Sequence, residues 1–388
     1  MGEINQHQDM TGTNVLQRLA AHCLPQARAV IRLVERQLLA WPLAIACLTV
    51  PAGVQAAYSN LFLFGDSLSD SGNNAFVFDY VVGPPLPPGT LRTPLPTSGN
   101  TFIPDFPYST PVGGRYSNGA VWAETFASSP HIGSGGALAS NLGGTNYAYA
   151  GARVGPVVSN FPFSLSTQVA GFLASLAQNQ TAAPADALYV VAGGGNDARD
   201  SISAAGQDMA AGKTQLEVLQ GIQARAAVYA GYVEGMVDQL LLAGAHDIVV
   251  WNTPNAGVAP AILAQNAGVL GATVSQLMNL SLRQALDDEL AAGVRIFDAF
   301  GFITGVSMAV RADPINNPYG LTDAANACSA IVGANCDDYF FWDGIHPTAA
   351  GHKLLAAAMA SFVPEPDTLL LLAISFFGLA AARQRKSR

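Results

Sequence analysis

The chain has 388 residues, of which half are hydrophobic and 12% are charged, and its formal net charge is −9. This composition excludes a disordered chain and allows one large domain or two ordinary ones. Residues 57–363 carry 10 basic side chains against 22 acidic ones, which argues against electrostatic binding of nucleic acid or anionic lipid.

The N-terminal segment has the pattern of a secretory signal. Basic residues precede an apolar run at 38–50, and small residues follow it up to Ala56. This order predicts export with cleavage near Ala56, so residues 1–56 are interpreted as a leader and signal peptide. The region before the run is long for such a signal. A start downstream of Met1 and a buried helix are the alternatives.

A polar string follows the first predicted strand, at 60–65. It reads Gly-Asp-Ser-Leu-Ser-Asp over 65–70, so Ser67 lies at the carboxyl end of the strand, where it can face substrate. The string is not the GxSxG elbow of other hydrolases, and a lone Gly-Asp-Ser is more often a turn. Ser67 is a candidate nucleophile that would need a base.

Residues 79–145 are rich in Pro, Gly, Ser and Thr. A loop region of this length is usually functional or mobile, and ligands of open α/β sheets bind at the carboxyl ends of strands. We expect it to form loops over the site, with a surface insertion as the alternative. Its aromatic residues, such as Tyr116 and Trp122, could line an acyl or sugar site or pack the loops onto the body.

Alternating strand and helix patterns continue along the chain. Including the first, the predicted strands are 60–65, 146–150, 188–192, 247–252 and 294–299. The main predicted helices are 218–243, 274–292 and 348–361. Several strands are continuous apolar runs, which suits a parallel sheet covered on both faces, and Gly244 and Gly293 lie at expected helix ends. The alternation favours a doubly wound α/β sandwich.

Two glycine-containing segments after predicted strands offer hydrogen-bond donors. Gly151 follows the second predicted strand, and Gly-Gly-Gly-Asn-Asp at 193–197 follows the third. Glycine allows close backbone approach, and Asn196 has a side-chain N–H₂, so both could serve an oxyanion. Each segment equally fits an ordinary turn. No Lys-Ser/Thr follows the glycines, which excludes a P-loop.

A candidate base lies near the C-terminal end of this part of the chain. His346 comes just before the last predicted helix, and Asp343 precedes it by three residues. One short turn can hold both, so that the carboxylate accepts the imidazole Nδ1–H; a helix N-terminal hydrogen bond is the commoner role of such a pair. The other histidines are interpreted as a loop, a strand-edge and a helix-surface residue, respectively His131, His246 and His352.

Cys328 and Cys336 lie outside the leader, eight residues apart. In an oxidising compartment a disulfide between them is the simplest interpretation, with two free thiols as the alternative. No Cys or His spacing suggests a zinc site.

The C-terminal segment, 364–388, begins after Val363 with Pro-Glu-Pro, continues with an apolar stretch at 368–382 and ends in a basic cluster. Together these features resemble a PEP-CTERM sorting signal, which implies export and removal of the tail by an exosortase-type enzyme. A plain C-terminal transmembrane anchor would give the same topology.

Four motifs in the middle of the chain together resemble the GDSL (SGNH) hydrolases. The 65–70 string looks like block I, Gly151 like the block II glycine, Asn196 like the block III asparagine, and Asp343-x-x-His346 like block V. They occur in the order of the family. The string Gly-Arg-Tyr-Ser-Asn-Gly at 114–119 also resembles a string found in lipase-like members.

The resemblance implies a three-layer α/β/α sandwich with a flavodoxin-like parallel sheet of about five strands over 57–363. It implies Ser67 as nucleophile and His346 as general base oriented by Asp343. It also implies an oxyanion hole formed by the N–H groups of Ser67 and Gly151 and by the Asn196 side chain, with no metal or organic cofactor.

The activity implied is cleavage of a carboxylic ester or lipid substrate by an exported esterase, lipase or phospholipase. The same scaffold hosts acyltransferases and carbohydrate O-deacetylases, so the fold does not fix the substrate. A non-catalytic extracellular matrix or binding protein is the alternative from another class.

Overall fold

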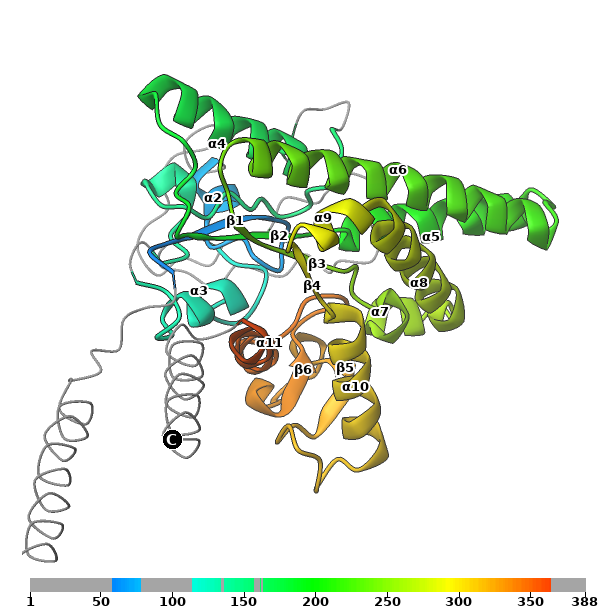
Figure 1. The fold of residues 1–388 in the computed structure, drawn as a ribbon. Coiled ribbons are helices and arrows are strands. Elements are labelled where there is room, and N and C mark those ends of the chain that lie inside the picture. The colour runs from blue at the N-terminus through cyan, green and yellow to red at the C-terminus, as the bar shows by residue number, and fades with distance from the viewer. Residues whose placement is uncertain (1–57, 78–113, 134–135, 157–160, 162, 364–388) are drawn as a thin grey trace, which may run out of the picture. The chain divides into compact units, whose positions relative to one another are not determined.

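A four-stranded parallel sheet forms the core of the protein (Figure 1). The computed structural model describes residues 58–77, 114–133, 136–156, 161 and 163–363. The strands are β1 (Leu61–Gly65), β2 (Leu188–Ala192), β3 (Asp247–Trp251) and β4 (Arg295–Phe297), paired in that order. Every residue of β1 and β2 is buried, as expected for a parallel sheet with both faces covered.

The segment predicted as a strand at 146–150 runs beside β1 without forming a regular strand. Three backbone hydrogen bonds of 2.7 to 3.1 Å join residues 145–149 to β1. The Asn146 side chain accepts the N–H of Ala148 at 2.9 Å, and the Asn73 side chain donates to the carbonyls of both residues. These side-chain bonds replace part of a regular ladder. The α/β/α fold is confirmed, but its edge is irregular where a fifth strand is predicted.

Helices lie on both faces of the sheet (Figure 1). One layer contains α4 (Leu165–Asn179), α5 (Gly195–Ala210), α6 (Gln215–Leu242) and α8 (Gly268–Ala285). The other contains α3 (Trp122–Ala127) and α11 (Ala349–Phe362), which pack on each other. Aromatic rings fill both interfaces. Phe62 of β1 lies 4.9 Å from Phe172 of α4, and Trp251 of β3 lies 4.4 Å from Trp122 of α3, between ring centroids.

The predicted helices are present with shifted ends. The segment 274–292 is divided into α8 and α9 (Asp287–Ala291). Helix α6 begins three residues before its predicted start because Thr214 and Glu217 form a capping box. Gly244 and Gly293 have φ of +103° and +106°, which confirms them as helix-terminating glycines.

Several short elements and one longer helix complete the fold. The remaining helices are α2 (Asn73–Val77), α7 (Pro260–Leu263) and α10 (Ala299–Ala312), and the 3-10 turns are η2 (Ser140–Leu142), η3 (Ala256–Val258), η4 (Cys328–Ala330) and η5 (Cys336–Asp338). A second parallel sheet consists of β5 (Asp323–Ala327) and β6 (Tyr339–Phe341). A disulfide joins Cys328 to Cys336 between these strands, with Cα atoms 5.4 Å apart.

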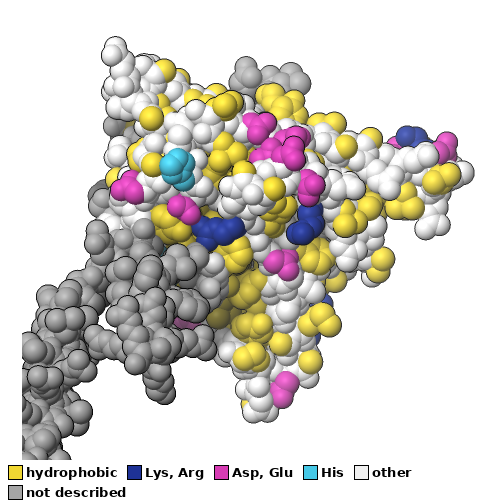
Figure 2. Space-filling model, in the orientation of Figure 1, with side chains coloured by type: hydrophobic (Ala, Val, Ile, Leu, Met, Phe, Trp, Pro, Cys, Tyr) yellow, Lys and Arg dark blue, Asp and Glu magenta, His cyan; other side chains and the backbone are white. Residues whose placement is uncertain are grey.

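The predicted signal peptide, the loops at 78–113 and the apolar tail stretch at 368–382 fall outside the described residues. Within the ranges described, no helix is both long and apolar enough to cross a bilayer. On the face shown in Figure 2, basic side chains are few and scattered, in keeping with the acidic composition of this part of the chain.

Candidate active site

Ser67 lies in a tight turn at the carboxyl end of β1. The side chain of Asp66 accepts the N–H of Leu68 at 3.0 Å, which fixes the backbone on both sides of the serine. Gly65 is required by close packing, because a Cβ at this position would lie 2.8 Å from the carbonyl oxygen of Ala192 at the end of β2. The turn holds Ser67 in place with only 7% of its surface exposed.

The structure brings Ser67, His346 and Asp343 into one hydrogen-bonded line. The Ser67 Oγ lies 2.8 Å from His346 Nε2, and His346 Nδ1 lies 2.7 Å from Asp343 Oδ2. The other carboxylate oxygen of Asp343 accepts the backbone N–H groups of Ile345 and His346, at 2.8 and 2.7 Å. With Nδ1 protonated, the imidazole donates to Asp343 and leaves Nε2 to accept the serine proton.

The string at 114–119 holds the histidine turn from the other half of the chain. Ser117 Oγ donates to the carbonyl of Pro347 at 3.0 Å, and the side chain of Asn118 accepts the N–H of Ala349 at 2.7 Å. The ring of Tyr116 lies 5.3 Å from the imidazole, between centroids. In the sequence, this string shows a resemblance to lipase-like members but no role. Its residue types could not reveal a contact made 230 residues away.

Asn196 lies in the first turn of α5. Gly194 precedes the helix with φ of +103°, where a Cβ would lie 2.7 Å from Thr253 Oγ1, so the entry into α5 requires glycine. The Asn196 side chain donates to the carbonyl of Ala152 at 2.8 Å. An amide nitrogen has two N–H groups, so this bond orients the side chain and leaves the second N–H for a ligand.

Gly151 begins a turn, residues 151–154, that is held in place from two directions. Its φ is +82°, a conformation that favours glycine. The preceding peptide is fixed at Ala150, whose N–H donates to Asp70 Oδ2 at 3.0 Å and whose carbonyl accepts from Asn74 at 3.1 Å. That carbonyl and the Gly151 N–H belong to one planar peptide, so fixing one aims the other. We call residues 151–154 the Gly151 turn.

A pocket of about 80 Å³ opens beside the serine. Its polar wall includes Asp66, Ser67, Asn196, Arg199 and His346. Its apolar wall includes Ala259, Ile262, Ile303, Phe340, Phe341 and Ile345. Gly151 is not among its lining residues, so its part in an oxyanion hole remains a prediction. In the described part of the chain, no cluster of three or more His, Cys, Asp or Glu side chains could hold a metal.

Burial shifts the pKa values of two charged side chains in the pocket wall. It lowers the pKa of Arg199 to about 10, which leaves this guanidinium charged at neutral pH. It raises the pKa of Asp66 to about 6 against the opposing effects of the Leu68 N–H and the His346 and Arg199 charges. A partly buried cation therefore lies in the wall that also carries Ser67 and His346.

One interpretation of an individual side chain is corrected, and one open alternative is decided. His352 is fully buried, where a helix-surface position is predicted; its Nδ1 accepts the N–H of Trp122 at 3.2 Å, and burial lowers its pKa to about 3. Trp122 packs in the core and donates to Ser69 Oγ at 3.0 Å. Neither side chain lines the pocket, because helix α11 presses its His352 face against α3.

Comparisons with known proteins identify the family of the chain and its C-terminal motif. The sequence profile of the family described as GDSL-like Lipase/Acylhydrolase matches residues 61–359. The profile of the PEP-CTERM protein-sorting motif matches residues 362–386.

The individual relatives include two esterases and an acyltransferase. Esterase EstA of Pseudomonas aeruginosa and esterase EstA of Pseudomonas putida are each 27% identical over 89% of this chain and 54% of their own length. The chain thus spans about half the length of these relatives. Phosphatidylcholine-sterol acyltransferase of Aeromonas hydrophila is 24% identical over 83% of this chain and 95% of its own. Among solved structures, the carbohydrate acetylesterase Est24 of Sinorhizobium meliloti aligns with a TM-score of 0.38 and 15% identity, over 81% of this chain and 99% of that one.

Proposed function

Because this chain belongs to the GDSL-like lipase/acylhydrolase family, we propose that it is an exported serine hydrolase that cleaves carboxylic esters. The observation that carries the proposal is the hydrogen-bonded line from Ser67 through His346 to Asp343 beside a partly apolar pocket. The two relatives named as esterases support the same class of reaction.

In the acylation step, Ser67 Oγ attacks the ester carbonyl while its proton passes to His346 Nε2. Asp343 holds the imidazole by Nδ1 and stabilises the positive charge that forms on it. Collapse of the tetrahedral intermediate breaks the bond to the alcohol oxygen, which takes the proton from His346. The alcohol leaves, and the acyl group stays on Ser67.

The carbonyl oxygen gains negative charge in this step and needs donors aimed at it. The Ser67 N–H, the Gly151 N–H and the free N–H of the Asn196 side chain are assigned this role. Deacylation repeats the sequence with water. His346 takes a proton from water, the hydroxyl attacks the acyl carbon, and the Ser67 oxygen leaves with that proton, releasing a carboxylic acid.

An acyltransferase is the second candidate. In that case an alcohol takes the place of water in deacylation, and the same residues act. The similarity to the Aeromonas acyltransferase over 95% of its length favours this candidate. Carbohydrate O-deacetylation is a further possibility for the substrate, since the fold does not select among esters.

We propose that residues 1–56 direct export, residues 57–363 form the hydrolase domain, and residues 364–388 form a sorting tail. The PEP-CTERM match supports export to the cell surface and processing by an exosortase-type enzyme. The tail would associate with the membrane until it is cut.

Hydrolysis of p-nitrophenyl esters from acetyl to palmitoyl, by the full chain and by its Ser67→Ala variant, tests the proposal. We expect the loss of Ser67 to lower kcat by roughly a million-fold, as removal of a triad nucleophile does elsewhere. Added glycerol as acyl acceptor separates the two candidates, because an acyltransferase would form glycerol ester in place of free acid. If the folded wild type and the variant are equally inert on every ester, with and without glycerol, the proposal fails and a binding role gains weight.

A further inference from the structure

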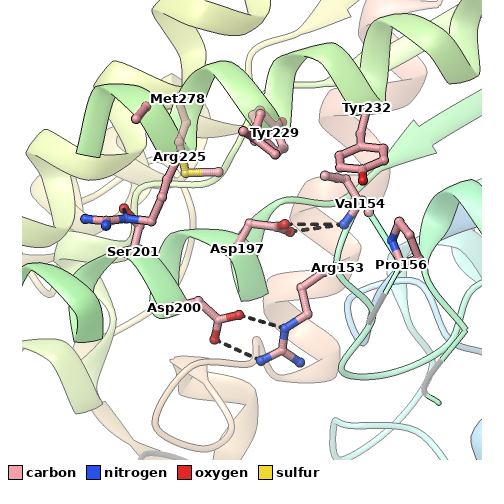
Figure 3. Close-up of a pocket in the computed structure, with 13 residues that line it drawn as sticks. Arg153, Val154, Pro156, Asp197, Asp200, Ser201, Arg225, Tyr229, Tyr232 and Met278 are labelled. Atoms are coloured by element: carbon pink, nitrogen blue, oxygen red, sulfur yellow. Dashed lines mark hydrogen bonds and ion pairs between the residues drawn. The ribbon is translucent and has the colours of Figure 1, made fainter. Parts of the chain in front are cut away.

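Arg153 connects the Gly151 turn to helix α5. Its Nη1 donates to the carbonyl of Gly151 at 2.9 Å. Its Nε and Nη2 donate to the two carboxylate oxygens of Asp200, each at 2.8 Å, as the paired dashed lines of Figure 3 show. One planar guanidinium therefore bridges a backbone carbonyl and a carboxylate, with the fixed fork geometry that only arginine offers.

Two further contacts join the same helix to the same turn. Asn196 donates to the carbonyl of Ala152 at 2.8 Å. Asp197 accepts the N–H of Val154 at 3.2 Å, again visible in Figure 3. The residues at 196, 197 and 200 lie within about one turn of α5, so a single rigid segment holds four consecutive residues, 151–154.

Backbone bonds also hold the Gly151 turn. The Ala152 N–H donates to the Tyr149 carbonyl at 3.1 Å, and the N–H groups of Leu165 and Ser166 donate to the carbonyls of Arg153 and Val154 at 2.9 and 3.1 Å. Gly151 itself has no side chain to anchor it, its positive φ is one that glycine adopts readily, and its carbonyl accepts from Arg153. Asn74 and Asp70 fix the peptide before Gly151, and Arg153 fixes the carbonyl after it. A donor must lie within a few tenths of an ångström of its place to stabilise an oxyanion, so both ends matter.

We infer that Arg153 and Asp200 are a positioning pair that aims the Gly151 N–H at the oxyanion. The inference rests on the proposed function, and it adds two residues that do not touch the substrate. Both line a separate cavity of about 440 Å³ between α5 and α6, with Tyr229 and Tyr232 on the facing helix.

An ordinary structural ion pair would behave differently from a positioning pair. The side chains of Arg153 and Asp200 are 25% and 54% exposed, and exposed pairs contribute modestly to folding, most where the fork is bidentate as it is here. Loss of the pair should therefore lower the melting temperature by only a few degrees. Its effect should fall on kcat, because a misaimed oxyanion donor weakens the transition state more than it weakens substrate binding.

A matched control lies at the opposite, amino-terminal ends of the strands. Arg295 pairs with Asp247 at 3.5 Å, and its side chain is also 25% exposed. These residues begin β4 and β3, whereas the site lies at the carboxyl ends of the strands. Arg295→Ala removes an arginine of equal exposure without touching the Gly151 turn.

The experiment compares wild type, Arg153→Ala, Arg153→Lys, Asp200→Ala, the double variant and Arg295→Ala on one p-nitrophenyl ester, with the melting temperature of each. We expect kcat to fall roughly 10- to 50-fold in Arg153→Ala, with KM within about threefold. The kcat of Arg153→Lys should lie between those of wild type and Arg153→Ala, since lysine keeps the charge but cannot make the fork. The double variant should be no worse than Arg153→Ala, because the two residues act as one unit.

An active wild type whose Arg153→Ala variant keeps its kcat would overturn the inference and leave the proposed function intact. An equal fall of kcat in Arg295→Ala would also overturn it, by showing a general loss of structure. Equal inertness of wild type and Ser67→Ala would overturn the proposed function, and the positioning pair with it.

Discussion

The two halves of the candidate site are built in different ways. The base side, Asp343 and His346, is organised within four residues, since one carboxylate accepts the imidazole and two backbone N–H groups of the same turn. The proposed oxyanion side, Gly151 and Asn196, depends on contacts among the turn after β1, the Gly151 turn and the start of α5.

Because of this difference, the two halves of the site should respond differently to substitutions. The bonds that place the imidazole on Asp343 form within four residues, while Ser117 and Asn118 support the turn from outside. A donor assembled from distant segments moves whenever one of those segments moves. The oxyanion side should therefore respond to many substitutions by small amounts, and the base side to few substitutions by large amounts.

Asp343→Asn should have the largest effect of these substitutions. Asparagine can still accept the two backbone N–H groups through its single oxygen, so the turn should keep its shape. Its amide nitrogen would then face His346 Nδ1 and favour the wrong tautomer, lowering kcat roughly 10,000-fold. Stopped-flow or steady-state kinetics of ester hydrolysis measure kcat, and thermal unfolding followed by circular dichroism checks that the variant is folded. A folded variant with more than a tenth of wild-type kcat would contradict the assigned base.

Asn196→Ala should lower kcat roughly 100- to 1,000-fold, as loss of one oxyanion donor does. It also removes the bond to Ala152, which is one of the contacts between distant segments that build the proposed oxyanion side. Asn196→Asp is the control for shape, because a carboxylate of the same size cannot donate. Comparable kinetics of wild type and both variants would remove Asn196 from the site.

Replacing Cys328 and Cys336 by serine tests how far the base side depends on its surroundings. Ser329 bonds to the carbonyl of Trp342, the residue before Asp343, so the disulfide loop touches the turn. Loss of a short disulfide loop should cost about 2–3 kcal/mol of unfolding free energy. We expect a lower melting temperature with kcat within a few-fold of wild type. A much larger loss of kcat would show that the turn is not self-sufficient.

Asp197→Asn probes a buried charge on the oxyanion side. Burial raises the pKa of this carboxyl to about 7, above its unfolded value, so the folded protein holds a proton that the unfolded chain has released. The stability from that proton is present at low pH and is lost as pH rises through about 7. The stability of the variant relative to wild type should therefore increase between pH 4 and 8, by up to about 4 kcal/mol.

Chemical denaturation of both proteins at several pH values measures this difference. A constant gap between the two across the whole range would show that Asp197 does not titrate as its burial implies.

Much of the fold could be predicted because the apolar runs were short and continuous. Strands β1, β2 and β3 and helices α6 and α11 lie close to their predicted segments. Helix α5 was not predicted, since its alanine, glycine and serine residues give no clear apolar stripe. The edge at 146–150 resembles a strand in sequence, but the side chains of Asn146 and Asn73 take part of the backbone hydrogen bonding that a regular strand would use.

The residues of the candidate site also differ in whether the sequence predicts them. Ser67, Asp343 and His346 could be predicted from short motifs, because each motif carries its own chemistry within a few residues. The ties from Ser117 and Asn118 to the histidine turn, and from Arg153 to Asp200, could not. They join segments that lie far apart along the chain, and a single sequence does not say which polar residues meet.

The contact between Ser67 and His346 spans 279 residues. Ser67 precedes His346 along the chain, and helix α11, which follows His346, packs on α3. A chain that stops before Asp343 would carry a serine with no means of activation. In the proposed mechanism, turnover would therefore report that these two distant segments have come together in the fold.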